Sequence, residues 1–146
     1  MSTRSTVLVL GGGSDIAAAT VATMQRAGQV RVIAAARDTD AAIGGLAMAA
    51  PGAELIGRRW DALDVAHHES FVNDVFDRYG PIDVVLCAVG QLGHHAGVSM
   101  AAIDVDAMVR ANFSGPAAAL SAVARRMVRH GSGTIVVLSS VAGARG

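Results

Sequence analysis

Short β-branched and apolar runs alternate with longer amphipathic runs along the chain, and this alternation most constrains the fold. The predicted strands are Val7–Leu10, Val30–Ala35, Glu54–Arg58, Val84–Ala88 and Thr134–Ser139. The predicted helices are Asp15–Ala27, Thr39–Ala49, Val65–Tyr79, Ala101–Arg110 and Pro116–His130. Repeated strand–helix–strand units form right-handed crossovers, and strands that are apolar throughout are typical of a parallel sheet covered on both faces. The sequence therefore predicts an α/β fold, a doubly wound parallel sheet in a single domain over residues 1–146.

The last predicted strand is followed by very little sequence. Only residues 141–146 come after Ser140, and no helix is predicted among them. We expect the sheet to be truncated after its fifth strand, which leaves an apolar edge uncovered. On this interpretation the isolated chain has poor solubility or associates with itself.

The composition favours a globular protein with a large interior, because 52% of the residues are hydrophobic and 16% are charged. Twelve basic residues balance twelve acidic ones, so no net charge attracts nucleic acid or an anionic membrane. The single cysteine, Cys87, excludes an internal disulfide and fits a reducing compartment. No apolar run has the length of a signal-peptide core or a membrane span, and the expected location is the cytoplasm.

A glycine-rich turn, Leu-Gly-Gly-Gly-Ser-Asp-Ile-Ala over residues 10–17, connects the first predicted strand to the first predicted helix. Glycine permits positive φ and a close approach of the backbone to a ligand. The helix that follows presents unpaired N–H groups and the positive end of its dipole to an anion. The turn predicts a pyrophosphate site, and a turn without a ligand is the alternative. No Gly-Lys-Ser/Thr follows, which argues against a phosphoryl-transfer enzyme.

This turn is similar to the Thr-Gly-x-x-x-Gly-Ile-Gly turn of the short-chain dehydrogenase/reductase family, with Gly11, Gly12 and Ile16 in matching places. Asp15 and Ala17 replace the two later glycines, and we expect the Asp15 carboxylate to point away from a ligand. The resemblance implies a Rossmann-type domain that binds NAD or NADP. The cofactor-binding residues that it implies within the turn are Gly11, Gly13, Ser14 and Ile16.

The second predicted strand ends in Ala36-Arg37, where NAD-specific members of this fold carry an acidic residue that binds the ribose hydroxyls. Ala36 stands at the acidic position, and Arg37 resembles the arginine with which NADP-preferring members bind the 2′-phosphate. The resemblance therefore favours NADP over NAD. A surface arginine without a ligand is the alternative.

Two further strand ends resemble cofactor-binding segments of the family. After the third strand, Asp61 and Ala62 match residues that contact the adenine, and Asp64 is predicted to cap the next helix. After the fourth strand, Gly90 matches the last residue of the family's Asn-Asn-Ala-Gly and implies a backbone that passes beside the cofactor ribose. The two asparagines are replaced in this chain, which indicates a divergent branch.

Two residues match catalytic positions. Asn112-Phe113-Ser114-Gly115, predicted to open the fifth helix, matches the family's Asn-x-x-Gly. This match implies that Asn112 distorts the helix and holds a water of the proton relay. A plain helix N-cap is the alternative. Ser140 matches the serine that hydrogen-bonds the substrate carbonyl.

The family's Tyr-x-x-x-Lys is absent from these residues. The only tyrosine, Tyr79, lies in an earlier predicted helix, and the chain contains no lysine. The resemblance implies hydride transfer between a nicotinamide and a small-molecule alcohol or ketone. Without a proton donor for the carbonyl, we expect these residues to be inactive on their own.

The family also implies a homo-oligomer, because the helices after its fourth and fifth strands commonly pair between subunits. A non-catalytic nucleotide-binding module or pseudo-enzyme fragment is the alternative function. A methyltransferase on the same sheet is disfavoured, because it leaves Asn112 and Ser140 unexplained. Within the family, residues 11–16, 61–64 and 89–93 resemble the keto-reductase partner of decaprenylphosphoryl-ribose epimerase.

Other polar clusters have simpler interpretations. Adjacent residues such as His67-His68 and His94-His95 point apart on a helix, and no carboxylate spacing completes a ligand set, so no metal site is predicted. Cys87 is interpreted as a small hydrophobic residue rather than a nucleophile. The arginines near residue 126 are interpreted as a solvated helix end.

Overall fold

A computed structural model describes residues 4–92, 101–143 and 145 of the chain, and it confirms the predicted α/β fold. Five parallel strands form one sheet in the order β3-β2-β1-β4-β5. The strands are β1 (Ser5–Leu10), β2 (Val30–Ala36), β3 (Glu54–Arg59), β4 (Val84–Cys87) and β5 (Thr134–Val137). The chain moves outward from β1 to β3 and then returns to the other side of β1. The strand order therefore reverses between β1 and β4, where open α/β sheets bind their ligands.

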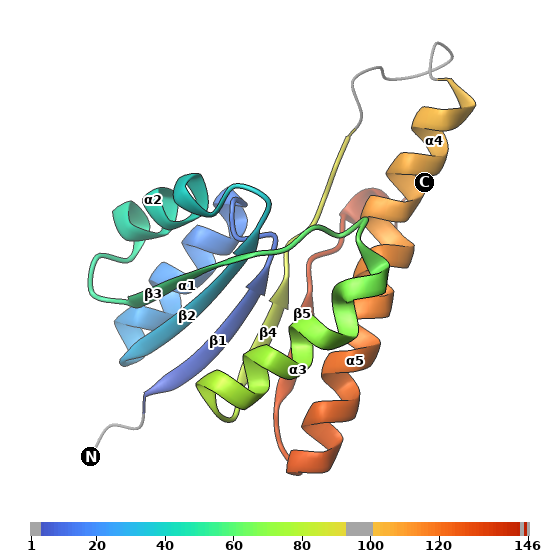
Figure 1. Cartoon of the computed structure of the whole chain (residues 1–146). Helices are drawn as coiled ribbons and strands as arrows, with labels where there is room; N and C mark the ends of the chain where they lie inside the picture. Colours follow the sequence, from blue (N-terminus) through green and yellow to red (C-terminus); the bar gives the residue numbers. More distant parts are fainter. Residues whose placement is uncertain (1–3, 93–100, 144, 146) are drawn as a thin grey trace.

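Helices cover both faces of the sheet (Figure 1). α1 (Asp15–Ala27) and α2 (Thr39–Ala49) pack on one face, and α3 (His68–Tyr79) and α5 (Gly115–His130) pack on the other. Alternate residues of β1 enter two separate buried clusters. Val7 and Val9 belong to the cluster with α1 and α2, whereas Leu8 and Leu10 belong to the cluster with α3 and α5. This alternation is what a doubly wound sheet requires.

Local capping fixes the ends of the helices. The Ser14 hydroxyl accepts a hydrogen bond from the Ala17 N–H at 3.3 Å and begins α1. The Asp38 carboxylate accepts one from the Ala41 N–H at 3.0 Å and begins α2. α5 ends at Gly131, whose φ of 82° belongs to the left-handed region that favours glycine. The predicted bounds of α1 and α2 are confirmed.

Three predicted helices differ from those of the structure. The helix predicted from Val65 begins with a 3₁₀ turn, Val65–His67, before α3. The two helices predicted on either side of Asn112 form one continuous rod. In it α4 (Ala102–Val109) leads into a π-helical turn, Arg110–Ser114, and then into α5. The prediction that a helix opens at Asn112 is therefore wrong, because the Gly115 N–H donates to the Arg110 carbonyl and hydrogen bonding continues through the turn.

Strand β5 lies at the edge of the described sheet and pairs with β4. Its apolar side chains are partly open to solvent, and Val137 is 56% exposed. Gly93, His94 and His95 of the sequence motifs lie outside the described residues. Of the helices that the structure does describe, none combines the length and the apolar character needed to cross a bilayer.

Candidate functional site

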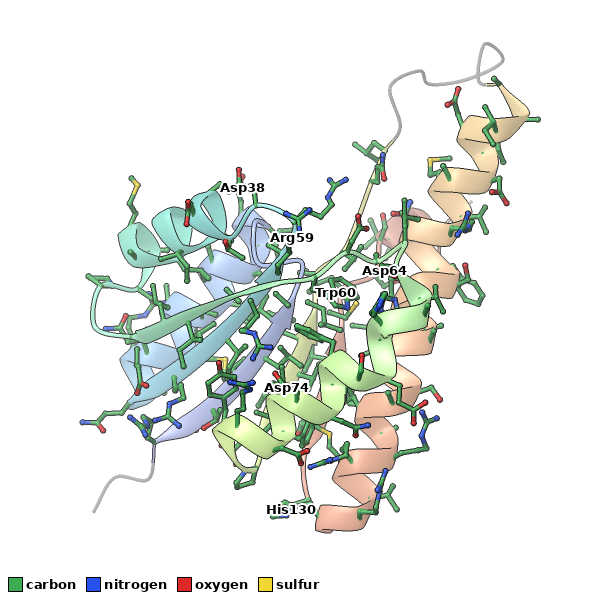
Figure 2. The ribbon with its side chains drawn as sticks, in the orientation of Figure 1. Asp38, Arg59, Trp60, Asp64, Asp74 and His130 are labelled. Atoms are coloured by element: carbon green, nitrogen blue, oxygen red, sulfur yellow. The ribbon has the colours of Figure 1, made fainter. Side chains whose placement is uncertain are left out.

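A cavity of about 640 Å³ opens at the carboxyl ends of the central strands. This volume lies within the range of about 300–1,000 Å³ that is usual for small-molecule sites. Its lining is shared by the ends of four strands, helix α2 and the π-helical turn: Gly11, Gly13, Ser14, Ala35, Ala36, Arg37, Asp38, Ala41, Trp60, Asp61, Ala62, Leu63, Ala88, Val89, Gly90, Gln91 and Ala111. Figure 2 shows Asp38, Arg59 and Trp60 at this end of the sheet, and His130 at the opposite end of the molecule.

The glycine-rich turn forms one wall of the cavity, and its first residue must be glycine. Gly11 has a φ of 87°, and a Cβ there would lie 2.9 Å from the carbonyl carbon and oxygen of Ala88. The N–H groups of Gly11 and Gly12 both donate to the Ala35 carbonyl, at 2.9 and 3.0 Å. The turn therefore connects the ends of β1, β2 and β4. A side chain at position 11 would push them apart.

The N-terminus of α1 follows this turn. The first N–H groups of an α-helix have no partner within the helix and favour an anion. Gly13 and Ser14 line the cavity. Asp15 is exposed and does not line the cavity, so its charge is directed elsewhere. Ile16 is also outside the lining, and its side chain is 62% exposed.

The end of β2 contributes charge of both signs. Arg37 and Asp38 both line the cavity and are exposed. The Arg59 guanidinium donates to the Arg37 carbonyl at 3.0 Å and ties this loop to β3. Within residues 4–92, 101–143 and 145, neither arginine forms an ion pair with a carboxylate. Two guanidinium groups without a carboxylate partner therefore lie near this end of the cavity.

The end of β3 forms another wall. Asp61 accepts a hydrogen bond from the Leu63 N–H at 2.9 Å, which closes a tight turn. Asp61 and Ala62 line the cavity. The Asp64 carboxylate, predicted to cap a helix, instead pairs with His67 Nδ1 at 2.7 Å and makes no capping hydrogen bond. Asp64 therefore stands at the predicted N-cap position, but its side chain hydrogen-bonds the His67 imidazole and does not cap the backbone of the 3₁₀ turn.

His68 lies behind this wall and is buried, whereas the adjacent His67 is exposed. Trp60 Nε1 donates to His68 Nδ1 at 3.2 Å, and His68 Nε2 lies 3.1 Å from the Ala62 carbonyl oxygen. Burial lowers the pKa of His68, although the hydrogen bond to Ala62 acts in the opposite direction. No group of three or more metal-ligating side chains is found among the described residues.

Asn112 connects the π-helical turn to the end of β4. Its Oδ1 accepts from the Gln91 N–H and its Nδ2 donates to the Gln91 carbonyl, both at 2.7 Å. Asn112 itself does not line the cavity, whereas Gly90 and Gln91 do. A Cβ at Gly90 would meet nothing within 4 Å, so packing within the protein does not require glycine there.

Ser140 follows β5 at the carboxyl edge of the sheet, where it is exposed and lies outside the cavity lining. Its carbonyl accepts from the Gly143 N–H at 3.1 Å. Tyr79 ends α3, and its hydroxyl accepts from Arg58 at 3.3 Å. Tyr79 is the last residue of α3 and does not line the cavity. Burial raises the pKa of the Cys87 thiol, which disfavours the reactive thiolate.

The cavity thus collects seven of the ten residues singled out in the sequence and excludes Ile16, Asn112 and Ser140. Sequence reasoning missed Trp60, Asp38 and Gln91 as lining residues. Each directly follows a strand end or stands one or two residues beyond a selected position. The signal that could have found them is position, because the loops after parallel strands meet at one edge of the sheet.

Comparison with known proteins agrees with this geometry. The chain is 36% identical over 142 residues to an uncharacterized oxidoreductase of Streptomyces coelicolor and covers 55% of that protein. It is 34% identical over 140 residues to an uncharacterized oxidoreductase of Mycobacterium tuberculosis, of which it covers 56%. These matches take in 95% of this chain, so the chain spans a little over half the length of these relatives.

Solved structures give the same result. The chain superimposes on an actinorhodin polyketide ketoreductase described with NADPH, with a TM-score of 0.83 and 30% identity, over 100% of this chain and 57% of that one. An NAD⁺-bound xylitol dehydrogenase gives a TM-score of 0.84 and 25% identity, over 97% of this chain and 55% of that one. The sequence model of the family described as "short chain dehydrogenase" matches residues 5–146. The chain belongs to the short-chain dehydrogenase family.

Proposed function

We propose that the chain is the dinucleotide-binding part of an oxidoreductase and holds NADP, or NAD, in the cavity at the ends of β1–β4. The observation that carries this proposal is the joint lining of one cavity by the glycine-rich turn, Arg37, and the Asp61-Ala62 segment. The pyrophosphate lies against Gly13 and Ser14 at the N-terminus of α1. The adenine lies against Asp61 and Ala62.

The residues that line the cavity fit a dinucleotide. Open space surrounds the position of a Cβ at Gly13, which leaves room for a phosphate beside the backbone. When bound, the nicotinamide supplies or accepts the hydride. The chain's own residues orient the dinucleotide: Arg37 at the ribose of the adenosine and Gly90 beside the other ribose.

NADP is the favoured form. A 2′-phosphate needs a cation, and Arg37 is a cavity-lining guanidinium without a carboxylate partner among the described residues. Asp38 is the competing feature, since a carboxylate beside the ribose would instead favour NAD. Related proteins include one described with NADPH and one bound to NAD⁺, so the preference rests on these two side chains.

Titration with NADPH and NADH, followed by nicotinamide fluorescence, tests the proposal. We expect saturable binding that is tighter for NADPH. Arg37→Gln should weaken NADPH binding about tenfold and leave NADH binding unchanged, because it removes a charge-assisted hydrogen bond. Asp38→Asn is the matched variant, since asparagine also caps a helix. Asp38→Asn should tighten NADPH binding, because it removes a negative charge near the 2′-phosphate. If this variant instead loses NADH binding alone, Asp38 binds the ribose hydroxyls of NAD. A folded chain that binds neither dinucleotide would overturn the proposal.

The chemistry of the whole protein is proposed on the resemblance alone. Ser140 hydrogen-bonds the carbonyl of a small alcohol or ketone, and Asn112 supports the proton relay. These residues contain no lysine, and Tyr79 hydrogen-bonds with Arg58 and does not line the cavity. We therefore expect the chain to bind dinucleotide without oxidising or reducing a substrate. Turnover by the purified chain would contradict this, and binding without turnover also describes the alternative of a non-catalytic module.

We also propose that the chain forms a homo-oligomer through the rod of α4, the π-helical turn and α5. Apolar side chains on this rod are open to solvent: Ile103 is 72% exposed and Phe113 is 71% exposed. Burial of such side chains against a second copy removes them from water. The cytoplasmic location stays a prediction. The resemblance to the keto-reductase partner of decaprenylphosphoryl-ribose epimerase stays one as well.

A further inference from the structure

His68 is the one histidine among the described residues that is buried, and both of its ring nitrogens have partners. It begins α3, behind the part of the cavity wall formed by Trp60, Asp61 and Ala62. The imidazole also lies beside the indole of Trp60, with ring centroids 5.1 Å apart and planes tilted by 30°. His68 therefore touches the residues on both sides of Asp61.

The hydrogen bonds define the protonation state of the ring. An indole N–H only donates, so Nδ1 of His68 must be the acceptor and carries no proton. A carbonyl oxygen only accepts, so Nε2 carries the proton and donates it to Ala62. The neutral Nε2–H form satisfies both partners. The imidazolium would set an N–H of His68 against the N–H of Trp60.

The wall has support on one further side. A Cβ at Gly115 would come 2.0 Å from the Ala62 carbonyl oxygen, so the start of α5 is in direct contact with this carbonyl. The same oxygen accepts the His68 hydrogen bond. Ala62 is thus held between α3 and α5, and Asp61 has little freedom to move without breaking the Trp60–His68–Ala62 bridge.

We propose that His68 is a positioning residue of the adenine end of the cavity, which holds Trp60 and Ala62 so that Asp61 faces the base. This inference deepens the proposed function and rests on it. His68 does not line the cavity and acts only through its two partners. The carboxylates that act electrostatically on the ring are Asp64, in the turn before α3, and Asp61, in the cavity wall.

Three variants test the role. His68→Phe keeps a ring of similar shape and removes both hydrogen bonds. His68→Gln retains a donor near the position of Nε2 and can restore the bond to Ala62. His67→Phe changes the adjacent exposed histidine and serves as the matched control. All are titrated with NADPH and with the reduced hypoxanthine analogue of NADPH, which lacks the amino group of adenine.

The wild-type chain should prefer the adenine dinucleotide. His68→Phe should weaken NADPH binding about tenfold and bind the hypoxanthine analogue nearly as before, which removes the preference. His68→Gln should recover part of it, and His67→Phe should match the wild type. Trp60 is the only tryptophan of the chain, so its emission reports independently whether its N–H has lost its partner.

Equal weakening of both dinucleotides would indicate a general structural role and overturn the proposal, as would an unchanged preference in His68→Phe. If His68→Phe fails to fold, His68→Gln is the test. A reduced preference for NADPH over the hypoxanthine analogue in that variant would support the proposal, and an unchanged preference would overturn it. A folded wild-type chain that binds no NADPH is a different result, since it overturns the proposed function itself.

Discussion

On one side of the sheet (β1–β3) the strands β1 and β2 are buried, whereas on the other side (β4–β5) the similarly apolar edge strand β5 is partly open to solvent. The more polar edge strand β3 has no buried residue either. All four residues from Val7 to Leu10 in β1 are inaccessible to solvent, as is Ile33 in β2. In β5, by contrast, Ile135 is 37% exposed and Val137 is 56% exposed. The helices show the same contrast, because α1 and α2 have buried faces whereas none of the described residues of α4 is buried.

The comparison shows that the apolar character of a strand does not fix its burial. β1 is covered by helices on both faces and by strands on both sides, whereas β5 has a strand on one side only. On the β1–β3 side, β1 and β2 therefore border the cavity with closely packed residues. The β4–β5 side provides apolar surface that is available for further contacts. The expected self-association of the chain stays a prediction.

Truncation of one isoleucine on each side should give the largest difference. Ile33→Ala opens a cavity in the buried centre and should lower the free energy of unfolding by about 2–5 kcal/mol. Ile135→Ala removes a partly exposed side chain and should cost less than about 1 kcal/mol. Urea denaturation of both variants checks this. Equal losses would mean that the two sides are equally well packed in solution.

A methyl group added where the two sides meet should have the next largest effect. Gly115→Ala drives a Cβ against the Ala62 carbonyl and should lower the free energy of unfolding by about 1–3 kcal/mol. Gly45→Ala, in α2, is the control, because nothing lies within 4 Å of its Cβ. It should stabilise by about 0.5–1 kcal/mol. A neutral Gly115→Ala would show that the start of α5 can move away from the cavity wall.

A charge on the exposed rod should alter association. Phe113→Glu places a carboxylate within the apolar surface and should weaken self-association at least about tenfold. Met48→Glu changes an 88% exposed residue of α2, which packs on the opposite face of the sheet from α5, and should leave association unchanged. Sedimentation equilibrium measures both. If Met48→Glu dissociates the chain and Phe113→Glu does not, the contact surface has been assigned to the wrong side.

A smaller effect should follow from pH. Burial lowers the pKa of His68 in the folded chain, so the unfolded chain binds more protons on that residue near its ordinary pKa of about 6.5. The contribution of neutral His68 to the free energy of unfolding is complete above that pH. It is lost as the pH falls towards the pKa that His68 has in the folded chain. The urea midpoint should therefore decrease between pH 7.5 and pH 5.5. In His68→Gln it should decrease less, and an equal decrease would exclude His68 as the source.

Much of the β1–β3 side could be predicted from sequence because its signals are local. Ser14 and Asp38 cap the helices that immediately follow them, and the bounds of α1 and α2 agree with the predicted ones. The glycine-rich turn is also a local signal, since Gly11 adopts a positive φ that favours glycine. Such features depend on residues a few positions apart.

The features that were missed depend on distant partners. His67 and His68 are identical in type, yet His68 is buried because it lies between Trp60 and Ala62. The resemblance implied a helix distorted at Asn112, and the π-helical turn contains that residue, but hydrophobic periodicity alone does not register a single extra residue within a helix. The Asn112 side chain contacts Gln91, which lies in another part of the chain. These outcomes needed tertiary structure.

The π-helical turn also sets how the chain responds to a change in its length. Each residue of an α-helix advances the rotation about its axis by about 100°. A π-helical turn holds one residue more than an α-helical turn, so the loss of one residue from Arg110–Ser114 can leave an ordinary α-turn with α5 facing as before. A residue lost from the first turn of α5 has no such reserve and would turn the following Ala122, Val123 and Met127 away from the core. A one-residue deletion should therefore be better tolerated within Arg110–Ser114 than within the next sixteen residues.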